Sequence, residues 1–143
     1  MKAQSMTGHL IRRLNQLSTH VFAKQTQASG YDITPVQFAA LDTIAANPGI
    51  DQAGVAAKIS YDRATIGGVI DRLVQKGAVE RTVSKHDRRA RAVTLTADGH
   101  RLLNEVLPIV ISLQNDLLPG LSQEERDQFL SLAGKAIRNA PSS

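Results

Sequence analysis

The chain has 143 residues, a formal net charge of +4 and no cysteine, which suggests one domain or one compact protomer. The absence of cysteine excludes disulfides, thiolate catalysis and cysteine-based peroxide sensing. Apolar runs are too short to span a membrane, and aromatic residues make up only 3% of the chain, so aromatic platforms for single-stranded nucleic acid are not expected. The polar N-terminus has no signal-peptide pattern, and we expect a cytoplasmic protein without membrane contact.

The first expected element is an amphipathic helix over residues 9–29. Its apolar residues recur at spacings of four, three and four, which puts them on one helical face: Leu10, Leu14, Leu17 and Val21. A polar stripe with the same spacing borders that face: His9, Arg13, Gln16 and His20. This stripe is either a solvated helix edge or part of a ligand site. In the second interpretation His9 and Arg13 bind a carboxylate, and Tyr31 and Phe38 supply an apolar wall.

A second helix is expected to begin after Thr34 and to extend to about Ala46. Thr34 can cap its first turn, Pro35 suits the first helical position, and Gln37 completes a capping box. Residues 47–49, with the sequence Asn-Pro-Gly, stop the helix.

A helix-turn-helix is predicted next. Asp51 can cap a short helix, and a longer helix is expected over about residues 62–76. The apolar positions of the longer helix are three or four residues apart: Ile66, Val69, Ile70, Leu73 and Val74. Residues 59–61 form the tight turn between the two helices, although this turn lacks its usual glycine. Gly77 ends the longer helix as a left-handed cap.

Two alternating segments, residues 79–84 and 91–96, predict a β-hairpin with a cationic tip. Three arginines fall within four positions at the tip: Arg88, Arg89 and Arg91. Residues 63–101 hold nine Lys/Arg and four Asp/Glu, a net +5. The excess positive charge of the chain therefore lies in the helix-plus-hairpin segment, as expected for a surface that binds duplex DNA.

The C-terminal part is predicted to be helical. Thr96 can cap a long helix whose apolar spacing continues in phase past Pro108 to Leu118. The helix either stops before the proline or is kinked by it, and the continued phase favours the kink. Ser122 and Glu125 begin a last helix as a capping box. The first and last helices carry more apolar surface than a small winged domain can cover, which favours a homodimer over a monomer whose helices pack only on themselves.

In this order and spacing the chain resembles the MarR family of bacterial transcription regulators. Three segments carry the resemblance over about residues 9–140. Asp87-Arg88-Arg89 with residues 93–96 and Gly99 is similar to the wing signature of the family, residues 71–81 to the end of its recognition helix and first wing strand, and residues 34–41 to the start of its second helix.

The resemblance implies a mainly helical fold with a small antiparallel β-wing, and one MarR-type domain over residues 1–143. Residues 35–96 would form the winged helix-turn-helix, and residues 1–34 and 97–143 a helical dimerisation portion. It also implies an obligate homodimer that represses nearby genes and releases DNA when a small molecule, often an aromatic acid, binds. Two modules on a twofold axis are expected to recognise a pseudo-palindromic operator with half-sites roughly 34 Å apart.

The residues expected to contact DNA lie at the start of the recognition helix and in the wing, because a helix in the major groove presents its N-terminal residues to base edges. They are Ser60, Tyr61, Asp62, Arg63, Ala64, Thr65, Gly68 and Arg72 in the helix, and Asp87, Arg88, Arg89 and Arg91 in the wing. Arg63 is suited to guanine O6 and N7. By the resemblance, Arg89 enters the minor groove and Asp87 braces it. The pair Gly67-Gly68 indicates either close approach to DNA or tight packing against the preceding helix.

The sequence gives less support to other functions. A phosphate-binding glycine loop, a nucleophile motif and zinc-like spacing of histidines are missing, so we expect no enzyme, cofactor or metal site. A constitutive or architectural DNA-binding protein without an effector is the alternative to a ligand-responsive repressor. An adaptor with a winged fold would have no need for the +5 concentrated in residues 63–101.

Overall fold

A computed structural model of the chain describes residues 2–83 and 91–141. The helices are α1 (Thr7–Ala28), α2 (Pro35–Ala46), α3 (Gln52–Lys58), α4 (Arg63–Gln75), α5 (Ala97–Leu113) and α6 (Gln123–Arg138), and the strands are β1 (Val79–Val83) and β2 (Arg91–Leu95). The two strands pair antiparallel. The predicted fold class, mainly helical with a small antiparallel wing, is therefore confirmed.

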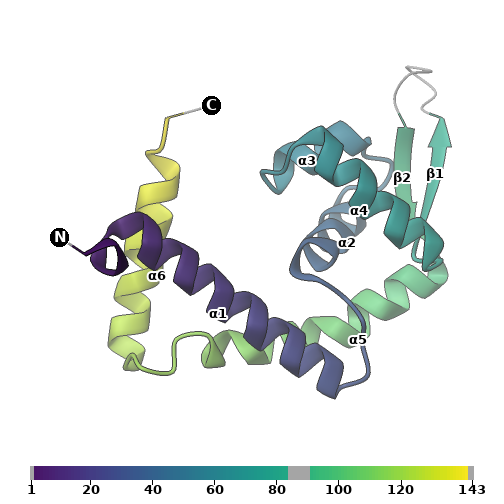
Figure 1. The fold of residues 1–143 in the computed structure, drawn as a ribbon. Helices are drawn as coiled ribbons and strands as arrows, with labels where there is room; N and C mark the ends of the chain where they lie inside the picture. Colours follow the sequence, from purple (N-terminus) through teal and green to yellow (C-terminus); the bar gives the residue numbers. More distant parts are fainter. Residues whose placement is uncertain (1, 84–90, 142–143) are drawn as a thin grey trace.

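The elements fall into two groups in space (Figure 1). Helices α2, α3 and α4 cluster with the β1–β2 hairpin at one end, while α1 and α5 cross and extend away from them. Helix α6 stands at the far end, beside the N-terminal half of α1. Among the described helices, none is long and apolar enough to cross a membrane.

Local capping chemistry determines where α2 and α3 begin. The Gln37 amide donates to the Thr34 hydroxyl at 3.2 Å, and the Thr34 amide donates to the Gln37 side chain at 3.3 Å, which is the predicted capping box. The Asp51 carboxylate accepts a hydrogen bond of 2.7 Å from the Gly54 amide at the start of α3. These contacts satisfy amides that have no partner within the helix.

Helix α5 continues through Pro108, as predicted, but ends at Leu113 rather than at Leu118. A single 3-10 turn, Gln114–Asp116, follows it. The Gln114 side-chain amide donates to the Val110 carbonyl at 2.9 Å. The tighter turn and this side chain together satisfy carbonyls at the end of the helix.

The hydrophobic core lies where α2, α4, α5 and the hairpin meet. Its largest fully buried apolar side chains are Leu41, Ile44, Ile66, Ile70, Leu73, Leu113, Val55, Val79, Val93 and Val106. The segment before α3 is also tied to the wing, because the Gly49 amide donates to the Val93 carbonyl at 3.2 Å and the Val93 amide donates to the Ile50 carbonyl at 2.8 Å. Helix-turn-helix and wing are therefore one packed unit rather than two appended parts.

Candidate nucleic-acid interface

The turn between α3 and α4 has the backbone geometry of a helix-turn-helix although it contains no glycine. Ser60 has φ +59°, in the left-handed region that non-glycine residues seldom adopt. The Tyr61 amide donates to the Ala56 carbonyl at 2.9 Å and the Ser60 amide to the Ala57 carbonyl at 3.4 Å, which is the Schellman pattern that closes a helix. Ser60 thus occupies the position that glycine usually takes, and both Ser60 and Tyr61 are exposed.

Asp62 caps α4, so its carboxylate is engaged within the protein. It accepts hydrogen bonds from the Thr65 amide at 2.7 Å and from the Thr65 hydroxyl at 2.9 Å. These bonds hold the pKa of Asp62 below its ordinary value. Asp62, which was predicted to contact DNA, here orients the first turn of α4 and the Thr65 side chain.

We expect the stability of the protein to fall with acidification partly through Asp62. A carboxyl with a lowered folded pKa contributes stability above its unfolded pKa, and that contribution disappears as pH falls through the folded pKa. Asp62→Asn keeps a good capping residue but removes the titration, so thermal unfolding measured from neutral to acidic pH should become less pH-dependent. Glu125 in the α6 capping box also has a lowered pKa, so some dependence should persist. Asp42→Asn on the exposed surface of α2 is the control, and equal pH profiles for the two variants would contradict this role.

The face of α4 opposite its buried residues is open. The spacing of three and four places Thr65, Gly68 and Arg72 in one exposed stripe, and Tyr61, Arg63 and Ala64 are also exposed. A Cβ added at Gly67 or Gly68 would meet no described atom within 4 Å. Tight packing against the preceding helix therefore does not account for the glycine pair.

Arg72 lies farther along this stripe, next to the start of α2. It shares a polar pocket with Asp32, Thr34, Gln37 and Lys76, among others. The Lys76 ammonium in that pocket donates to the Asp32 carbonyl and to the Gln37 side chain. The structure therefore brings most of the predicted helix residues to the exposed start of α4, with Arg72 one turn or more away from them.

The wing is described at its base only. Strands β1 and β2 pair from Val79 opposite Leu95 to Val83 opposite Arg91, and the Arg91 side chain is exposed. The predicted DNA contacts Asp87, Arg88 and Arg89 lie outside the described residues, so their roles remain predictions.

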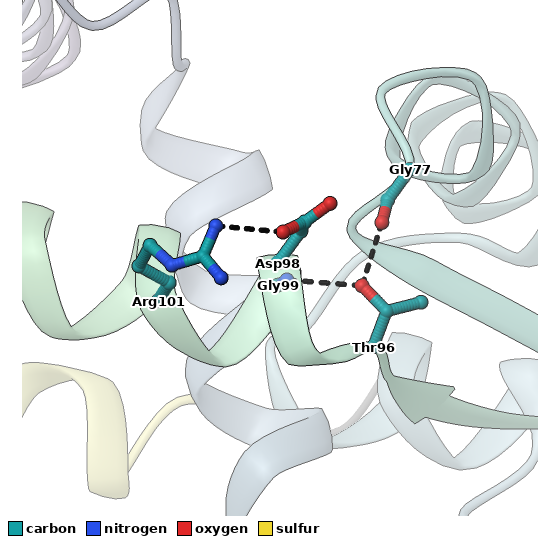
Figure 2. A network of polar contacts seen from close by, with 5 residues as sticks. All are labelled: Gly77, Thr96, Asp98, Gly99 and Arg101. Atoms are coloured by element: carbon teal, nitrogen blue, oxygen red, sulfur yellow. Dashed lines mark hydrogen bonds and ion pairs between the residues drawn. The ribbon is translucent and has the colours of Figure 1, made fainter.

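A polar joint connects the wing to α5 (Figure 2). The Thr96 hydroxyl donates to the Gly77 carbonyl at 2.6 Å and accepts from the Gly99 amide at 3.0 Å. The Thr96 amide donates to the Ala78 carbonyl at 3.0 Å. Gly99 is buried against Ala78, and an added Cβ would overlap the Ala78 carbonyl oxygen and lie 2.9 Å from its carbonyl carbon. The Thr and Gly of the wing signature thus hold the wing and α5 in contact.

Arg81, which the sequence analysis used only as a positive charge and as part of the resemblance, makes contacts that the sequence did not predict. Its guanidinium contacts Gln52 of α3 and both Gly67 and Asp71 of α4. A signal was present in the alternating strand pattern, because Arg81 lies two residues after the buried Val79 and therefore on the inward face of β1.

The four residues predicted to bind a ligand do not converge within the single chain. The Arg13 guanidinium donates to the Gln16 side chain at 2.8 Å, near the N-terminal end of α1. Phe38 contacts the core beside Phe22, with ring centroids 6.5 Å apart, and Phe22 is nine residues from Arg13, roughly 14 Å along the helix.

The other two residues follow the same division. His9 lies in the first turns of α1, with its ring 3.4 Å from the Arg12 guanidinium. The Tyr31 hydroxyl donates to Glu105 of α5 at 2.8 Å, and this hydrogen bond raises the pKa of Tyr31. His9 and Arg13 thus lie in the N-terminal half of α1, and Tyr31 and Phe38 lie where the chain passes from α1 into the winged portion.

The chain is similar to known proteins along nearly its whole length. Residues 31–90 match a family model described as the MarR family. The chain is 31% identical over 137 residues to the transcriptional regulator HosA of Escherichia coli, covering 96% of this chain and 98% of HosA. Its structure is similar to that of BpsR from Bordetella bronchiseptica, with a TM-score of 0.87, 28% identity and 99% of each chain covered. The DNA binding of BpsR is regulated by 6-hydroxynicotinic acid. The chain is also similar to a mutant of MarR from E. coli complexed with operator DNA, with a TM-score of 0.81, 28% identity, and 90% of this chain and 91% of that chain covered.

Proposed function

The chain belongs to the MarR family of transcriptional regulators, and we propose that it is a homodimeric repressor that binds a pseudo-palindromic duplex operator and is released from it by a small aromatic carboxylate. The observation that carries this proposal is the open face of α4 next to a hairpin that continues into an arginine-rich segment. A helix of this kind fits the major groove, and a cationic finger fits the narrower groove beside it.

DNA binding is proposed to use two kinds of contact. Residues 60–61, residues 63–65 and Gly68 would face base edges, with Arg63 as the side chain best suited to guanine. Arg88 and Arg91 would contact phosphates, while Arg89, braced by Asp87, would enter the minor groove. The structural relative with operator DNA supports this arrangement by likeness of fold.

Dimerisation is proposed to use residues 1–34 and 97–143. The structure describes every residue of α6, and none of them is buried. Even the apolar side chains of Leu130 and Ile137 are 64% and 76% exposed. An apolar groove of about 700 Å³ lies between α1, the segment that follows α5, and α6. Its lining includes Leu14, Leu117 and Phe129. A second copy of the same chain would cover this apolar surface, as expected for an obligate dimer.

The proposed function is tested by selecting duplexes from a random library with the full chain. We expect a pseudo-palindromic site with half-sites about one helical turn apart. Arg63→Ala should weaken binding to the selected site, whereas Lys135→Ala, which removes an exposed charge from α6, should not. If no sequence is enriched, the chain is not a sequence-selective regulator.

Gly68→Ala is expected to stabilise the protein and weaken DNA binding at the same time. Alanine in an exposed helix is favoured over glycine by up to about 1 kcal/mol, and the space around Gly68 is open in the described residues. If the backbone of α4 approaches a base edge at this point, the added methyl group should cost about fivefold or more in operator affinity. Thermal unfolding and fluorescence anisotropy measure the two effects. Gly8→Ala in α1 is the control, and unchanged affinity for Gly68→Ala would exclude close approach there.

The effector is proposed to be an aromatic carboxylate, with BpsR and 6-hydroxynicotinic acid as the supporting precedent. Because the predicted ligand residues are apart in one chain, the proposed site would form at the dimer interface. His9 and Arg13 would come from one protomer, and Tyr31 and Phe38 from the other. Calorimetric titration with benzoate and 6-hydroxynicotinate should give binding heats that Arg13→Ala removes and Lys24→Ala retains. Identical heats from both variants would remove Arg13 from the site. If no such ligand lowers operator affinity, the constitutive DNA-binding alternative is favoured.

A further inference from the structure

Arg81 links three elements of the winged portion through one side chain. It extends from β1, and its Nε donates to the Gln52 side chain of α3 at 2.6 Å. One terminal nitrogen donates to the Gly67 carbonyl of α4 at 3.3 Å and lies 2.5 Å from the Asp71 carboxylate on the same helix. The wing, the first helix of the helix-turn-helix and the recognition helix therefore share one guanidinium.

The geometry of these contacts needs an arginine. A guanidinium is planar and carries five donors in a fixed fork, so it contacts several acceptors in fixed directions at once, whereas a lysine ammonium acts as a compact point charge. The Arg81 side chain is only 21% exposed, against 58% for Asp71. An exposed ion pair contributes little, but this one is partly shielded and shares its cation with two further hydrogen bonds.

The same contacts keep the Arg81 guanidinium engaged within the protein. Its guanidinium is engaged by Gln52, Gly67 and Asp71, and its side chain lies on the inward face of β1. The neighbouring Glu80 and Thr82 are exposed on the other face. Arg81 is thus directed away from the outer surface of the strand and is only partly exposed, whereas Arg91, on the same face of the hairpin but nearer its tip, is exposed.

We propose that Arg81 is a positioning residue that holds α4 at a fixed orientation to the wing, so that base contacts from α4 and groove contacts from the wing form together. This inference rests on the proposed function as a sequence-selective DNA-binding protein. A specific complex needs both sets of contacts in one geometry, whereas non-specific binding depends on phosphate charge alone. Loosening the joint should therefore reduce selectivity rather than general DNA affinity.

The experiment compares wild type and Arg81→Lys in the 143-residue chain. Affinities are measured for the selected operator duplex and for a scrambled duplex of equal length, each over a salt series, with thermal unfolding alongside. Arg81→Lys should lower the operator-to-scrambled affinity ratio by about tenfold, the change that corresponds to losing one charge-assisted contact. The slope of log affinity against log salt should stay unchanged, because no phosphate contact is lost.

Two further variants make the result specific. Asp71→Asn removes the anionic partner from a side chain that is half exposed, so the protein should fold, and the affinity ratio should fall in the same direction. Arg91→Ala is the matched control, because loss of a phosphate contact should weaken both complexes similarly and reduce the salt slope by about one.

Each outcome separates this inference from the proposed function. An unchanged affinity ratio in Arg81→Lys and Asp71→Asn, with only the unfolding temperature lowered, would show a merely structural role and overturn the inference alone. An equal loss of both affinities with a smaller salt slope would make Arg81 a phosphate contact, which also overturns it. A wild-type ratio near one would overturn the proposed function, and this inference with it.

Discussion

Gly99→Ala should lower the free energy of unfolding by about 3 kcal/mol or more, at the upper end for overpacking a closely packed site. The added Cβ would overlap the Ala78 carbonyl oxygen, which is backbone and cannot rotate away as a flexible side chain would. That carbonyl also accepts the Thr96 amide, so any movement that relieves the overlap disrupts the joint between wing and α5. Urea denaturation of wild type and variant measures the effect.

Gly8→Ala is the matched control for this prediction. Gly8, like Gly99, lies in the first turn of a helix, but a Cβ added at Gly8 meets nothing within 4 Å among the described residues. The control should be neutral or slightly stabilising, because alanine is the better helix former. Equal stabilities for the two variants would mean that α5 does not pack this closely on the wing.

Leu130→Glu is expected to separate the proposed dimer into monomers. Leu130 lines the apolar groove between α1, the segment that follows α5, and α6, and is 64% exposed in one protomer. In a twofold dimer the substitution occurs twice, and the loss of two buried leucine side chains costs about 3–6 kcal/mol. The dimer dissociation constant should therefore rise by at least about a hundredfold.

Light scattering during gel filtration measures this change over a dilution series. Ser131→Glu introduces the same charge on the opposite side of α6, where Ser131 lies beside Glu124 and Asp127, and it should leave the dimer intact. In Leu130→Glu, operator affinity should fall because the dimer is lost. In Ser131→Glu, it should stay unchanged. A wild-type chain that is monomeric at all concentrations, or two variants with the same mass, would contradict the proposed interface.

Most of the helix boundaries were predictable from the sequence because they depend on contacts three residues apart. The predicted caps Thr34, Asp51 and Thr96 each accept a hydrogen bond from a backbone amide three residues on, and Ser122 does the same at the start of α6. The prediction was less accurate for the end of α5, where apolar spacing continues past Leu113 although regular α-helix does not. Spacing reports which residues face the core, and it is insensitive to whether the backbone is α-helical or 3-10.

The missing glycine in the helix-turn-helix illustrates the limit of residue preferences. Ser60 adopts the left-handed backbone at a cost that local hydrogen bonds of Tyr61 and Ser60 itself offset. The turn was therefore predicted from its flanking helices and not from its own residue types. Preferences describe what is common, whereas the surrounding packing decides what is adopted.

Interactions between distant segments were beyond sequence reasoning. Arg81 is 29 residues from Gln52 and 14 from Gly67, and no spacing rule connects them. The same holds for Gly99, whose place in the wing signature was evident by resemblance while its contact with Ala78 became visible only in the folded chain. The proposed ligand residues depend on one further level, the arrangement of two protomers.

Titration of the selected operator duplex with the full chain over a salt series tests most directly whether a dimer holds duplex DNA through α4 and the cationic wing. Fluorescence anisotropy gives the affinity, and light scattering of the complex gives its stoichiometry. We predict two protomers for each operator, and a log affinity that falls linearly with log salt between about 50 and 200 mM at a slope of about −0.9 for each phosphate neutralised. A flat salt dependence, or a single protomer bound to each operator, would contradict this mode of binding.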